Sequence, residues 1–542
     1  MKCIGFRWTT SVALLFACAL MICCAATLQA ATGPEVAMHQ GISPIAQFGQ
    51  DLGRLPGDTP IELVAILNLQ DEDGLRALIA AQNSPDSPSY HQFLTPEEFV
   101  QRFSPSPSAY SAVVSYFQES GFAVETTPNR QLVIANGTAA KVEQSFKTEL
   151  HRFYFQGKVH YANTSAPSVP ANLVTSIRAI EGLDSRELVS HMRIAPEAVP
   201  SSSSGTPAGY SPDQIAKAYD FPKLHGWNGT GKTMAVASAY DFKDSDLQTF
   251  DSTFGITPAG YSRVFVKTSQ GGNGTGFETT LDVEYSTALG NGAFELVYLV
   301  NRPTFSNFTI EFNQIVADNQ ADVVTLSWGL CEQQQPSGEI TQWDGILMQG
   351  VAQGQTWFVA TGDSGAFDCG GTTLAVDYPA SSPFVTACGG TALNLTSTDS
   401  IMSETASSIS GGGSSIVESQ PSWEFGSAFF TNGKRWTADY SMDADPNTGL
   451  AVFQNGKWYV GYGTSFVGPY SAGLAASISQ YKSTRLGLFA ARLSQLGNSR
   501  HLYPIVLHDI TSGRNGFYSA GPGWDPPTGW GSPDGYMLML NF

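Results

Sequence analysis

The sequence predicts an α/β protein in which a large C-terminal domain, built on a central and mostly parallel sheet, follows a smaller α+β domain. The chain has 542 residues, more than one hydrophobic core usually serves, so two or more domains are expected. Between residues 210 and 542, short apolar runs alternate with helical segments. That alternation is typical of a parallel sheet covered by helices on both faces.

The first 30 residues have the pattern of a secretory signal peptide. Lys2 and Arg7 precede an apolar run from Ser11 to Ala26, which is too short to span a membrane comfortably. No later apolar stretch is long enough to cross a bilayer. We therefore expect a secreted protein without a membrane anchor, either extracellular or periplasmic.

Residues 36–185 are expected to form the α+β domain, because strand-like runs alternate there with helical stretches. The predicted strands are Ile61–Leu69 and Gln131–Ala135, and the predicted helices are Asp73–Ala81, Pro107–Ser120 and Ala139–Phe146. Residues 186–209 are expected to be a linker, since the stretch from Pro196 to Gly209 is rich in Pro and Ser. Exposed linkers are where processing cuts fall.

Residues 210–542 are expected to form the larger domain. The predicted strands are Thr233–Ala237, Phe294–Val300, Val323–Trp328 and Thr356–Thr361, and the predicted helices are Asp246–Phe254, Glu278–Leu289 and Thr341–Gln353. In sheets of this kind, catalytic groups gather at the carboxyl ends of the strands.

Composition restricts the partners and the working conditions. The net charge of −19 argues against a nucleic-acid partner, which calls for a basic patch. Only 14% of the residues are charged, against roughly 25% in typical soluble proteins. Because the chain has only 28 Lys and Arg and 8 His, the positive charge that accumulates in acid has a low ceiling, which favours survival there.

Three of the seven cysteines lie beyond the signal peptide: Cys331, Cys369 and Cys388. In an oxidising compartment, one disulfide and one free thiol is the simplest arrangement. We expect Cys331 to pair with Cys369, since both follow motif-rich loops, and Cys388 to be a buried strand thiol.

Ser465 is the first candidate for chemistry. It lies in Gly463-Thr-Ser-Phe-Val-Gly-Pro, at the predicted start of a helix of small apolar residues, and looks like a subtilisin-type nucleophile. Free amides and the helix dipole at such a position favour developing negative charge. A serine that only caps a core helix is the commoner interpretation of this pattern.

A serine nucleophile needs a base, and residues 210–542 contain only His225, His501 and His508, none of them in a His-Gly-Thr setting. Glu278 and Asp282 are one helical turn apart and can therefore hydrogen-bond each other. Such a pair is usually a solvated helix face, but its apolar neighbours indicate partial burial. A carboxylate base implies an enzyme that works in acid, where histidine is already protonated.

Asp363 follows an apolar strand in the segment Thr361-Gly-Asp-Ser-Gly. A Gly-flanked Asp at a strand end is often only a turn residue. If burial keeps it protonated, it can instead donate a hydrogen bond to an oxyanion.

Two further carboxylates, Asp509 and Asp525, lie near a Gly-rich loop close to the C-terminus. Carboxylates together with backbone carbonyls suit a hard cation such as Ca²⁺. On these residues alone, an ordinary Gly/Pro loop is the simpler interpretation.

Together these motifs resemble the serine-carboxyl peptidases, the sedolisin or kumamolisin-like family, whose catalytic domain has a subtilisin-like fold. The resemblance covers nearly the whole chain after the signal peptide. It rests on Glu278-x-x-x-Asp282, Ser327-Trp-Gly, Gly-Asp363-Ser-Gly, Asp443-Ala-Asp-Pro-Asn-Thr-Gly, Gly-Thr-Ser465-x-x-x-Pro, Asp509-Ile and Gly521-x-Gly-Trp-Asp525-Pro, with His91-Gln-Phe-Leu-Thr-Pro in the first domain.

The resemblance implies a role for each candidate residue. Ser465 would be the nucleophile, Glu278 the general base and acid, Asp282 the residue that orients Glu278, and Asp363 the stabiliser of the oxyanion. Some relatives carry an acidic residue on the first strand of the catalytic domain, where this chain has Ser238. That departure is expected to change how Glu278 is tuned.

The resemblance also implies a cation and a precursor. One structural Ca²⁺ would be held by the side chains of Asp509 and Asp525 and by the carbonyls of Ile510, Gly521 and Gly523. The first domain would be an activation domain that acts as intramolecular inhibitor and chaperone and is removed by self-cleavage near residues 185–209.

We therefore expect a secreted, monomeric, acid-active endopeptidase that acts on proteins or peptides through an acyl-enzyme. Three alternatives stay open. The chain could be a tripeptidyl exopeptidase of the same family, a histidine-dependent subtilisin-like peptidase, or a catalytically silent secreted binding protein.

Overall fold

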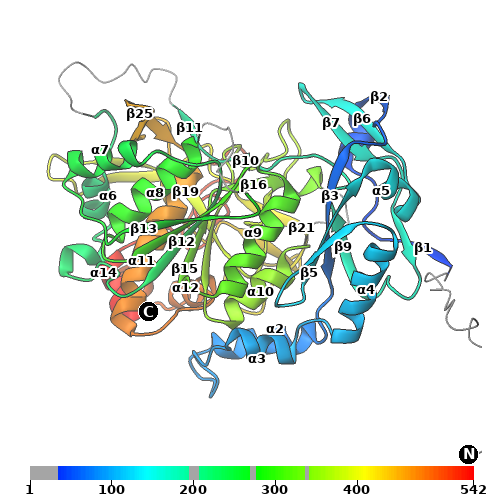
Figure 1. The fold of residues 1–542 in the computed structure, drawn as a ribbon. Coiled ribbons are helices and arrows are strands. Elements are labelled where there is room, and N and C mark those ends of the chain that lie inside the picture. The colour runs from blue at the N-terminus through cyan, green and yellow to red at the C-terminus, as the bar shows by residue number, and fades with distance from the viewer. Residues whose placement is uncertain (1–33, 195–206, 269–275, 336–340) are drawn as a thin grey trace, which may run out of the picture.

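An eight-stranded sheet forms the centre of the larger domain in the computed structural model, which describes residues 34–194, 207–268, 276–335 and 341–542 (Figure 1). The strand order is β13-β14-β12-β15-β17-β19-β20, with β23 paired to β19, and all neighbours except β19 and β20 run parallel. The bounds are β12 Thr233–Ala239, β13 Tyr261–Phe265, β14 Phe294–Val300, β15 Val323–Leu326, β17 Thr356–Ala360, β19 Thr386–Leu395, β20 Ile401–Ala406 and β23 Tyr440–Asp443. The predicted subtilisin-like α/β architecture is confirmed. The predicted signal peptide and most of the stretch from Pro196 to Gly209 lie outside the described residues.

Helices cover both faces of this sheet. α8 (Phe277–Leu289) and α11 (Val467–Lys482) pack on one face, and α9 (Phe305–Asp318) and α10 (Asp344–Ala352) pack on the other (Figure 1). Strand side chains alternate accordingly, so that Ala235 and Ala237 join the α9–α10 cluster while Met234 joins the α8–α11 cluster. This two-sided burial explains why the strands read as continuous apolar runs in the sequence.

α11 carries a glycine where it contacts the end of α8, and this allows the two helices to come close together. A methyl group at Gly473 of α11 would lie 2.7 Å from the Gly290 nitrogen, at the end of α8. The small residues of α11 therefore allow a close helix pair, and every residue of α8 from Glu278 to Leu289 is buried. This burial is what gives Glu278 and Asp282 of α8 their unusual environment.

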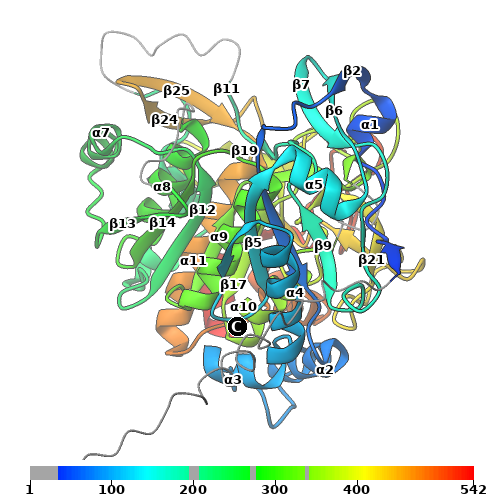
Figure 2. The ribbon, with the colours of Figure 1, turned by 45° about the vertical axis from the view of Figure 1, so that its right-hand side comes forward.

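The N-terminal domain is built on an antiparallel sheet of order β4-β5-β3-β9. Its elements are β3 Pro60–Leu67, β4 Ala123–Thr126, β5 Leu132–Thr138, β9 Ile177–Glu181, α2 Glu72–Gln82, α3 Pro96–Arg102, α4 Pro107–Glu119 and α5 Ala139–Phe146. One face of the sheet packs on α4 and α5, and the other faces α9 and α10 of the larger domain (Figures 1 and 2). A second sheet, β2-β6-β7 (Gln50–Arg54, Leu150–Phe155 and Lys158–Asn163), extends from it.

Two short strands after the N-terminal domain pair with the larger domain. β10 (Val189–Ser190) is antiparallel to β16 (Trp328–Cys331) (Figure 1). β11 (Arg193–Ile194) is antiparallel to β25 (Lys457–Tyr462), which itself pairs with β24 (Leu450–Gln454) (Figure 2). Residues 187–194, within the predicted linker, are therefore held as an added strand over the larger domain. No helix among the described residues has the length and apolar character needed to traverse a bilayer.

The predicted disulfide is present between Cys331 and Cys369, with a Cα–Cα distance of 5.2 Å, and Cys388 is a buried free thiol. Cys331 ends β16, and its neighbour across the ladder is Asp377 of β18 (Asp377–Tyr378). The disulfide therefore ties the loop after β17 to the strand that receives residues 189–190.

Candidate active site

The structure brings Ser465, Glu278, Asp282 and Asp363 together at the carboxyl ends of β15 and β17. Ser465 lies in a short 3-10 turn (Thr464–Phe466) that leads into α11, and Asp363 lies just beyond β17. Glu278 and Asp282 lie on adjacent turns of α8. Parallel strands leave their ligand-binding groups at this edge, so the sheet topology accounts for the meeting of residues far apart in sequence.

Ser465 is fully buried under residues 189–194, and Gly463 shapes the turn that presents it. Gly463 has φ +126°, a conformation that favours glycine, and a methyl group there would clash with the His191 carbonyl oxygen. The Ser465 backbone N–H donates to that carbonyl oxygen at 3.2 Å. The Ser465 Oγ has no hydrogen-bond partner by distance and angle within the described chain.

Glu278 and Asp282 are buried carboxyl groups with one free oxygen each. Ser190 donates a hydrogen bond to Glu278 Oε2, and Ser327 Oγ donates to Asp282 Oδ1 at 2.7 Å. Glu278 Oε1 and Asp282 Oδ2 have no partner among the described residues. Two buried carboxyl groups one helical turn apart can share a proton.

The pKa of each carboxyl in this pair lies above its ordinary value. Burial is the main cause for both, and the charge of Glu278 raises the pKa of Asp282 further. The hydrogen bond from Ser190 and the nearby Ser465 hydroxyl act in the opposite direction on the pKa of Glu278. Two hydroxyls thus lower the pKa of Glu278 and one, that of Ser327, lowers the pKa of Asp282, which favours placing the shared proton on Asp282.

Asp363 faces the same space as the Ser465 amide. Its Oδ1 accepts hydrogen bonds from Thr464 N at 2.8 Å and Thr464 Oγ1 at 3.1 Å, while its buried Oδ2 has no partner among the described residues. A methyl group at Gly463 would lie 2.6 Å from Asp363 Oδ2 on the same side as the His191 carbonyl oxygen. Burial raises the pKa of Asp363 to about 6, so in acid this carboxyl can donate a hydrogen bond.

Sequence reasoning missed Ser190, His191 and Asp377. His191 N donates to the Ser327 carbonyl at 3.1 Å, and the His191 imidazole Nε2 lies 3.3 Å from Asp377 Oδ2. None of these residues lies in a motif that indicates a site. The one available signal was the position of Ser190 and His191 at the domain boundary, where a precursor segment can enter its own cleft.

The three histidines of the larger domain are placed elsewhere. His225 Nε2 lies 2.7 Å from Asp220 Oδ1, and its ring stacks on Tyr536. His501 and His508 are exposed. No hydrogen bond joins His225, His501 or His508 to Ser465 in the described chain, so the arrangement offers the serine a carboxylate and not an imidazole.

The hydroxyl of Ser238 contacts Thr279 Oγ1 at 2.8 Å and Trp328 Nε1 at 3.1 Å.

Four of the five residues predicted to hold calcium contact one another in pairs. Gly523 N donates to both oxygens of Asp509 at 3.1 Å, and Gly521 N donates to Asp525 Oδ2 at 2.8 Å. Burial, with a contribution from the charge of Asp509, raises the pKa of Asp525 to about 7. A cation beside two such carboxylates would relieve that charge, so the donor set fits Ca²⁺. In the described chain, no group of three or more His, Cys, Asp or Glu side chains is arranged to hold a metal.

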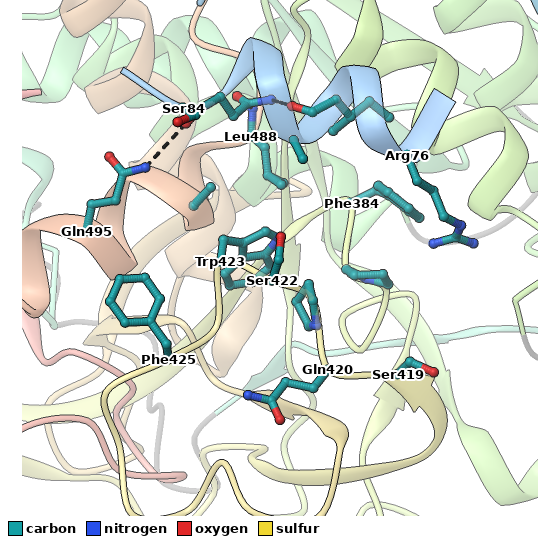
Figure 3. Close-up of a pocket in the computed structure, with 16 residues that line it drawn as sticks. Arg76, Ser84, Phe384, Ser419, Gln420, Ser422, Trp423, Phe425, Leu488 and Gln495 are labelled. Atoms are coloured by element: carbon teal, nitrogen blue, oxygen red, sulfur yellow. Dashed lines mark hydrogen bonds between the residues drawn. The ribbon is translucent and has the colours of Figure 1, made fainter. Parts of the chain in front are cut away.

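A separate cavity of about 430 Å³ lies between the two domains (Figure 3). Arg76 and Ile79 of α2 line one side, and Trp423, Phe384 and Leu488 of the larger domain line the other. The cavity contains none of the predicted site residues. Its lining is contributed by both domains, so it is a hollow in their interface.

Comparisons with known proteins agree with this arrangement. Residues 49–186 match the Pro-kumamolisin activation domain family, and residues 294–496 match the subtilase family. Sedolisin of Pseudomonas sp. (strain 101) is 33% identical over 522 residues, which cover 90% of this chain and 88% of sedolisin. Human tripeptidyl-peptidase 1 is 28% identical over 525 residues, 90% of this chain and 92% of that protein.

A solved structure is similar as well. Pseudomonas sedolisin, described as a serine-carboxyl proteinase complexed with two molecules of pseudo-iodotyrostatin, aligns with a TM-score of 0.56 at 32% identity. The alignment covers 62% of this chain and 98% of that one. The chain therefore belongs to the sedolisin family of serine-carboxyl peptidases and is a serine-type peptidase made as a zymogen with an activation domain.

Proposed function

We propose that the protein is a secreted, acid-active endopeptidase that works through Ser465, Glu278 and Asp282 with Asp363 as oxyanion stabiliser. In the reaction, Glu278 takes the proton of Ser465 while Oγ attacks the carbonyl carbon of the substrate. The Ser465 N–H and protonated Asp363 donate hydrogen bonds to the carbonyl oxygen as it becomes negative. Glu278 then protonates the leaving amine, and water hydrolyses the acyl-enzyme.

One observation carries this proposal. A peptide carbonyl, that of His191, accepts a hydrogen bond from the Ser465 amide at 3.2 Å, on the side of Gly463 where Asp363 Oδ2 also lies. The hydroxyl of Ser465 is close enough to Glu278 to lower the pKa of that carboxyl against the effect of burial. Nucleophile, base and oxyanion donors therefore surround one carbonyl group.

The path of the chain through the cleft favours an endopeptidase over a tripeptidyl exopeptidase. On the N-terminal side of His191, residues 189–190 pair with β16 and Glu187 bridges to Thr304, so the bound strand continues beyond a third residue. On the C-terminal side, residues 193–194 pair with β25. An N-terminally acetylated peptide of ten or so residues should be cut internally; release of tripeptides from free N-termini alone would favour the exopeptidase.

The test of the proposed chemistry is incubation of purified precursor from about pH 3 to about pH 8, a range that brackets carboxyl and imidazole titration. Wild type should convert to a shorter form in acid, whereas Ser465→Ala and Glu278→Gln should stay intact with unchanged circular dichroism. Complete processing of Ser465→Ala, with no other peptidase present, would rule out Ser465 as nucleophile.

We also propose that Asp509 and Asp525, with the carbonyls of Ile510, Gly521 and Gly523, hold one Ca²⁺ that stiffens the C-terminal loop. Chelation should lower the Tm of wild type and leave the Tm of Asp509→Asn unaffected. Equal Tm for wild type with and without chelator would argue against a bound cation. Secretion, predicted from the first 30 residues, is tested by N-terminal sequencing of protein recovered from the culture medium.

A further inference from the structure

Thr464 precedes Ser465 in the chain and hydrogen-bonds the carboxyl group of Asp363. We propose that Thr464 is a positioning residue of the reaction: it holds one oxygen of Asp363, so that the acidic hydrogen is carried by the other oxygen and is directed to the substrate carbonyl. This inference rests on the proposed function, because Thr464 acts through the oxyanion stabiliser named there.

Two donors of Thr464 meet the same oxygen of Asp363. The Thr464 backbone N–H donates to Asp363 Oδ1 at 2.8 Å, and the Thr464 hydroxyl lies 3.1 Å from the same atom. Asp363 Oδ2 is buried and has no hydrogen-bond partner within the described chain. In a protonated carboxyl, one oxygen carries the hydrogen and the other is the better acceptor. The oxygen that faces two donors is therefore the acceptor, and the hydrogen lies on Oδ2.

The Thr464 hydroxyl has one hydrogen and two possible acceptors. Its oxygen lies 3.1 Å from Asp363 Oδ1 and 3.2 Å from the Gly362 carbonyl oxygen, and it accepts a hydrogen bond from the Gly362 N–H at 3.2 Å. The Gly362 carbonyl oxygen already accepts from the Gly411 N–H at 3.0 Å. A hydrogen bond to an ionisable carboxyl is the stronger of the two choices, so the hydroxyl hydrogen is directed to Asp363.

The side chain of Thr464 is held in one orientation. It is fully buried, and a β-branched side chain has little freedom about its first torsion angle. A methyl group at Gly390 of β19 would lie 3.6 Å from Thr464 Cγ2. The methyl branch of Thr464 thus packs toward β19, while the hydroxyl branch faces Asp363. The position of the Asp363 carboxyl is therefore fixed by a rigid neighbour.

Burial and charge also act on Asp363. Burial raises the pKa of Asp363 to about 6, and both donors of Thr464 act in the opposite direction. The titratable groups whose charges interact with this carboxyl are His191, Arg193, Glu278 and Asp377. A hydrogen bond donated to a carboxylate stabilises its ionised form. Removal of the Thr464 hydroxyl should therefore raise the pKa of Asp363 further.

Two consequences separate this role from simple support of the turn. Without the hydroxyl, the acidic hydrogen is less strictly confined to Oδ2, so the oxyanion is less well stabilised and kcat falls. At the same time, Asp363 keeps its hydrogen to a higher pH, so the range in which the enzyme works extends upward. A turn that is only loosened would lower the rate or the Tm without moving the pH profile in this direction.

The test compares Thr464→Val with Thr464→Ser as acid-processed enzyme, on an internally quenched peptide taken from the wild-type digest of denatured casein. Thr464→Val should lower kcat about ten-fold in acid, keep KM within about two-fold and move the upper limb of the pH profile up by about half to one pH unit. Thr464→Ser keeps the hydroxyl and should restore both kcat and the position of the limb.

Thr448→Val is the matched control, because the Thr448 hydroxyl donates to another buried carboxyl, with its oxygen 2.6 Å from Asp443 Oδ1. The limb of this variant should coincide with that of wild type, and an equal shift there would overturn the inference. If Thr464→Val does not fold, Thr464→Ala removes the same hydroxyl without placing a methyl group against the carboxyl, and it should show the same upward shift.

Asp363→Asn separates the failure of this inference from the failure of the proposed function. If Asp363→Asn lacks the limb and the limb of a folded variant without the Thr464 hydroxyl stays in place, the positioning role is overturned and the proposed function stands. An unchanged limb in Asp363→Asn would instead overturn the oxyanion role of Asp363, and the positioning role of Thr464 with it.

Discussion

At the residue scale, two serines share access to one carboxylate. Ser190 of the precursor segment donates to Glu278 Oε2, and Glu278 is the base proposed for Ser465. While that hydrogen bond lasts, Glu278 is stabilised by a group that takes no part in the reaction. We therefore expect this contact to slow self-cleavage, even though the His191 carbonyl of the precursor lies at the proposed oxyanion donors.

Removing the Ser190 hydroxyl should speed the first self-cleavage. We expect Ser190→Ala to process about three- to ten-fold faster than wild type in acid, because a hydrogen bond to a charged group contributes about 1.5–3 kcal/mol, only part of which is recovered in the transition state. The rate is read from the decay of full-length mass. Ser190→Thr, which keeps a hydroxyl, is the matched control and should process at the wild-type rate; a slower Ser190→Ala would mean that the contact assists cleavage.

Asp363 should set the upper limit of the active pH range. Burial raises the pKa of Asp363 to about 6. Below that value the carboxyl is protonated and donates to the oxyanion; above it the group ionises and repels the developing charge. Peptide hydrolysis should therefore fall as pH rises through about 6. Asp363→Asn retains a donor that does not ionise, so its residual kcat/KM should lack this limb, and an unchanged limb in that variant would assign it to another group.

At the element scale, the sequence predicted the regular parts of the site and missed the irregular ones. The helix predicted at Glu278–Leu289 is α8 (Phe277–Leu289), and the predicted strand Phe294–Val300 is observed with the same bounds. The predicted strand Val323–Trp328 is instead divided into β15 and β16 around Ser327. Strong periodicity and two-sided burial made α8 and the strand Phe294–Val300 predictable from local sequence.

The strand pairs of residues 189–194 had no such local signal. β10 and β11 are two residues each, and their ladders are completed only by β16 and β25, more than a hundred residues further along the chain. Asp377 likewise becomes a site residue only because β18 pairs with β16. Short strands whose partners are distant depend on tertiary context, which a single sequence does not contain.

The disulfide between Cys331 and Cys369 should stabilise β16, the strand that pairs with residues 189–190. It closes a loop of 38 residues, for which the chain-entropy relation gives about 4 kcal/mol. We expect the double change Cys331→Ser and Cys369→Ser, made in a Ser465→Ala background, to lower the Tm and the urea midpoint of the precursor. Reducing agent should lower the Tm of the Ser465→Ala parent by a similar amount and leave the Tm of the double variant unchanged. A parent whose Tm does not change in reducing agent would show that the bond contributes little.

At the scale of the whole molecule, the two domains share one hydrophobic cluster. Val64 and Ile134 of the N-terminal sheet belong to the same cluster as Phe308 and Leu347 of the larger domain. Polar contacts add to it, with Asn129 Nδ2 donating to Asn313 Oδ1 at 2.7 Å. Cutting one peptide bond leaves this interface intact, so the cleaved activation domain should remain an inhibitor until the interface itself is weakened.

The larger domain as a whole buries many carboxyl groups, and this burial should favour stability in acid. Burial raises the pKa of Glu295 and of Asp377 to about 8, and raises those of Glu284 and Glu311 well above their ordinary value. Each such group is more easily protonated in the folded state than in the unfolded chain. Its contribution to stability is therefore complete below the unfolded value of about 4 and is lost as pH rises through the folded value.

The precursor should accordingly be most stable in mild acid and lose stability between about pH 5 and about pH 8. At the acid end, the limit comes from carboxylates with lowered pKa such as Glu187, where burial is outweighed by Arg302 and Lys158 and stability is lost as pH falls below about 4. Thermal unfolding of Ser465→Ala across this range measures the curve without self-cleavage. Glu295→Gln, which cannot ionise, should flatten this fall, since each pH unit between the unfolded pKa of about 4 and the folded pKa of about 8 costs about 1.4 kcal/mol. A Tm that rises steadily from acid to neutral pH would mean that these buried groups are compensated by partners outside the described residues.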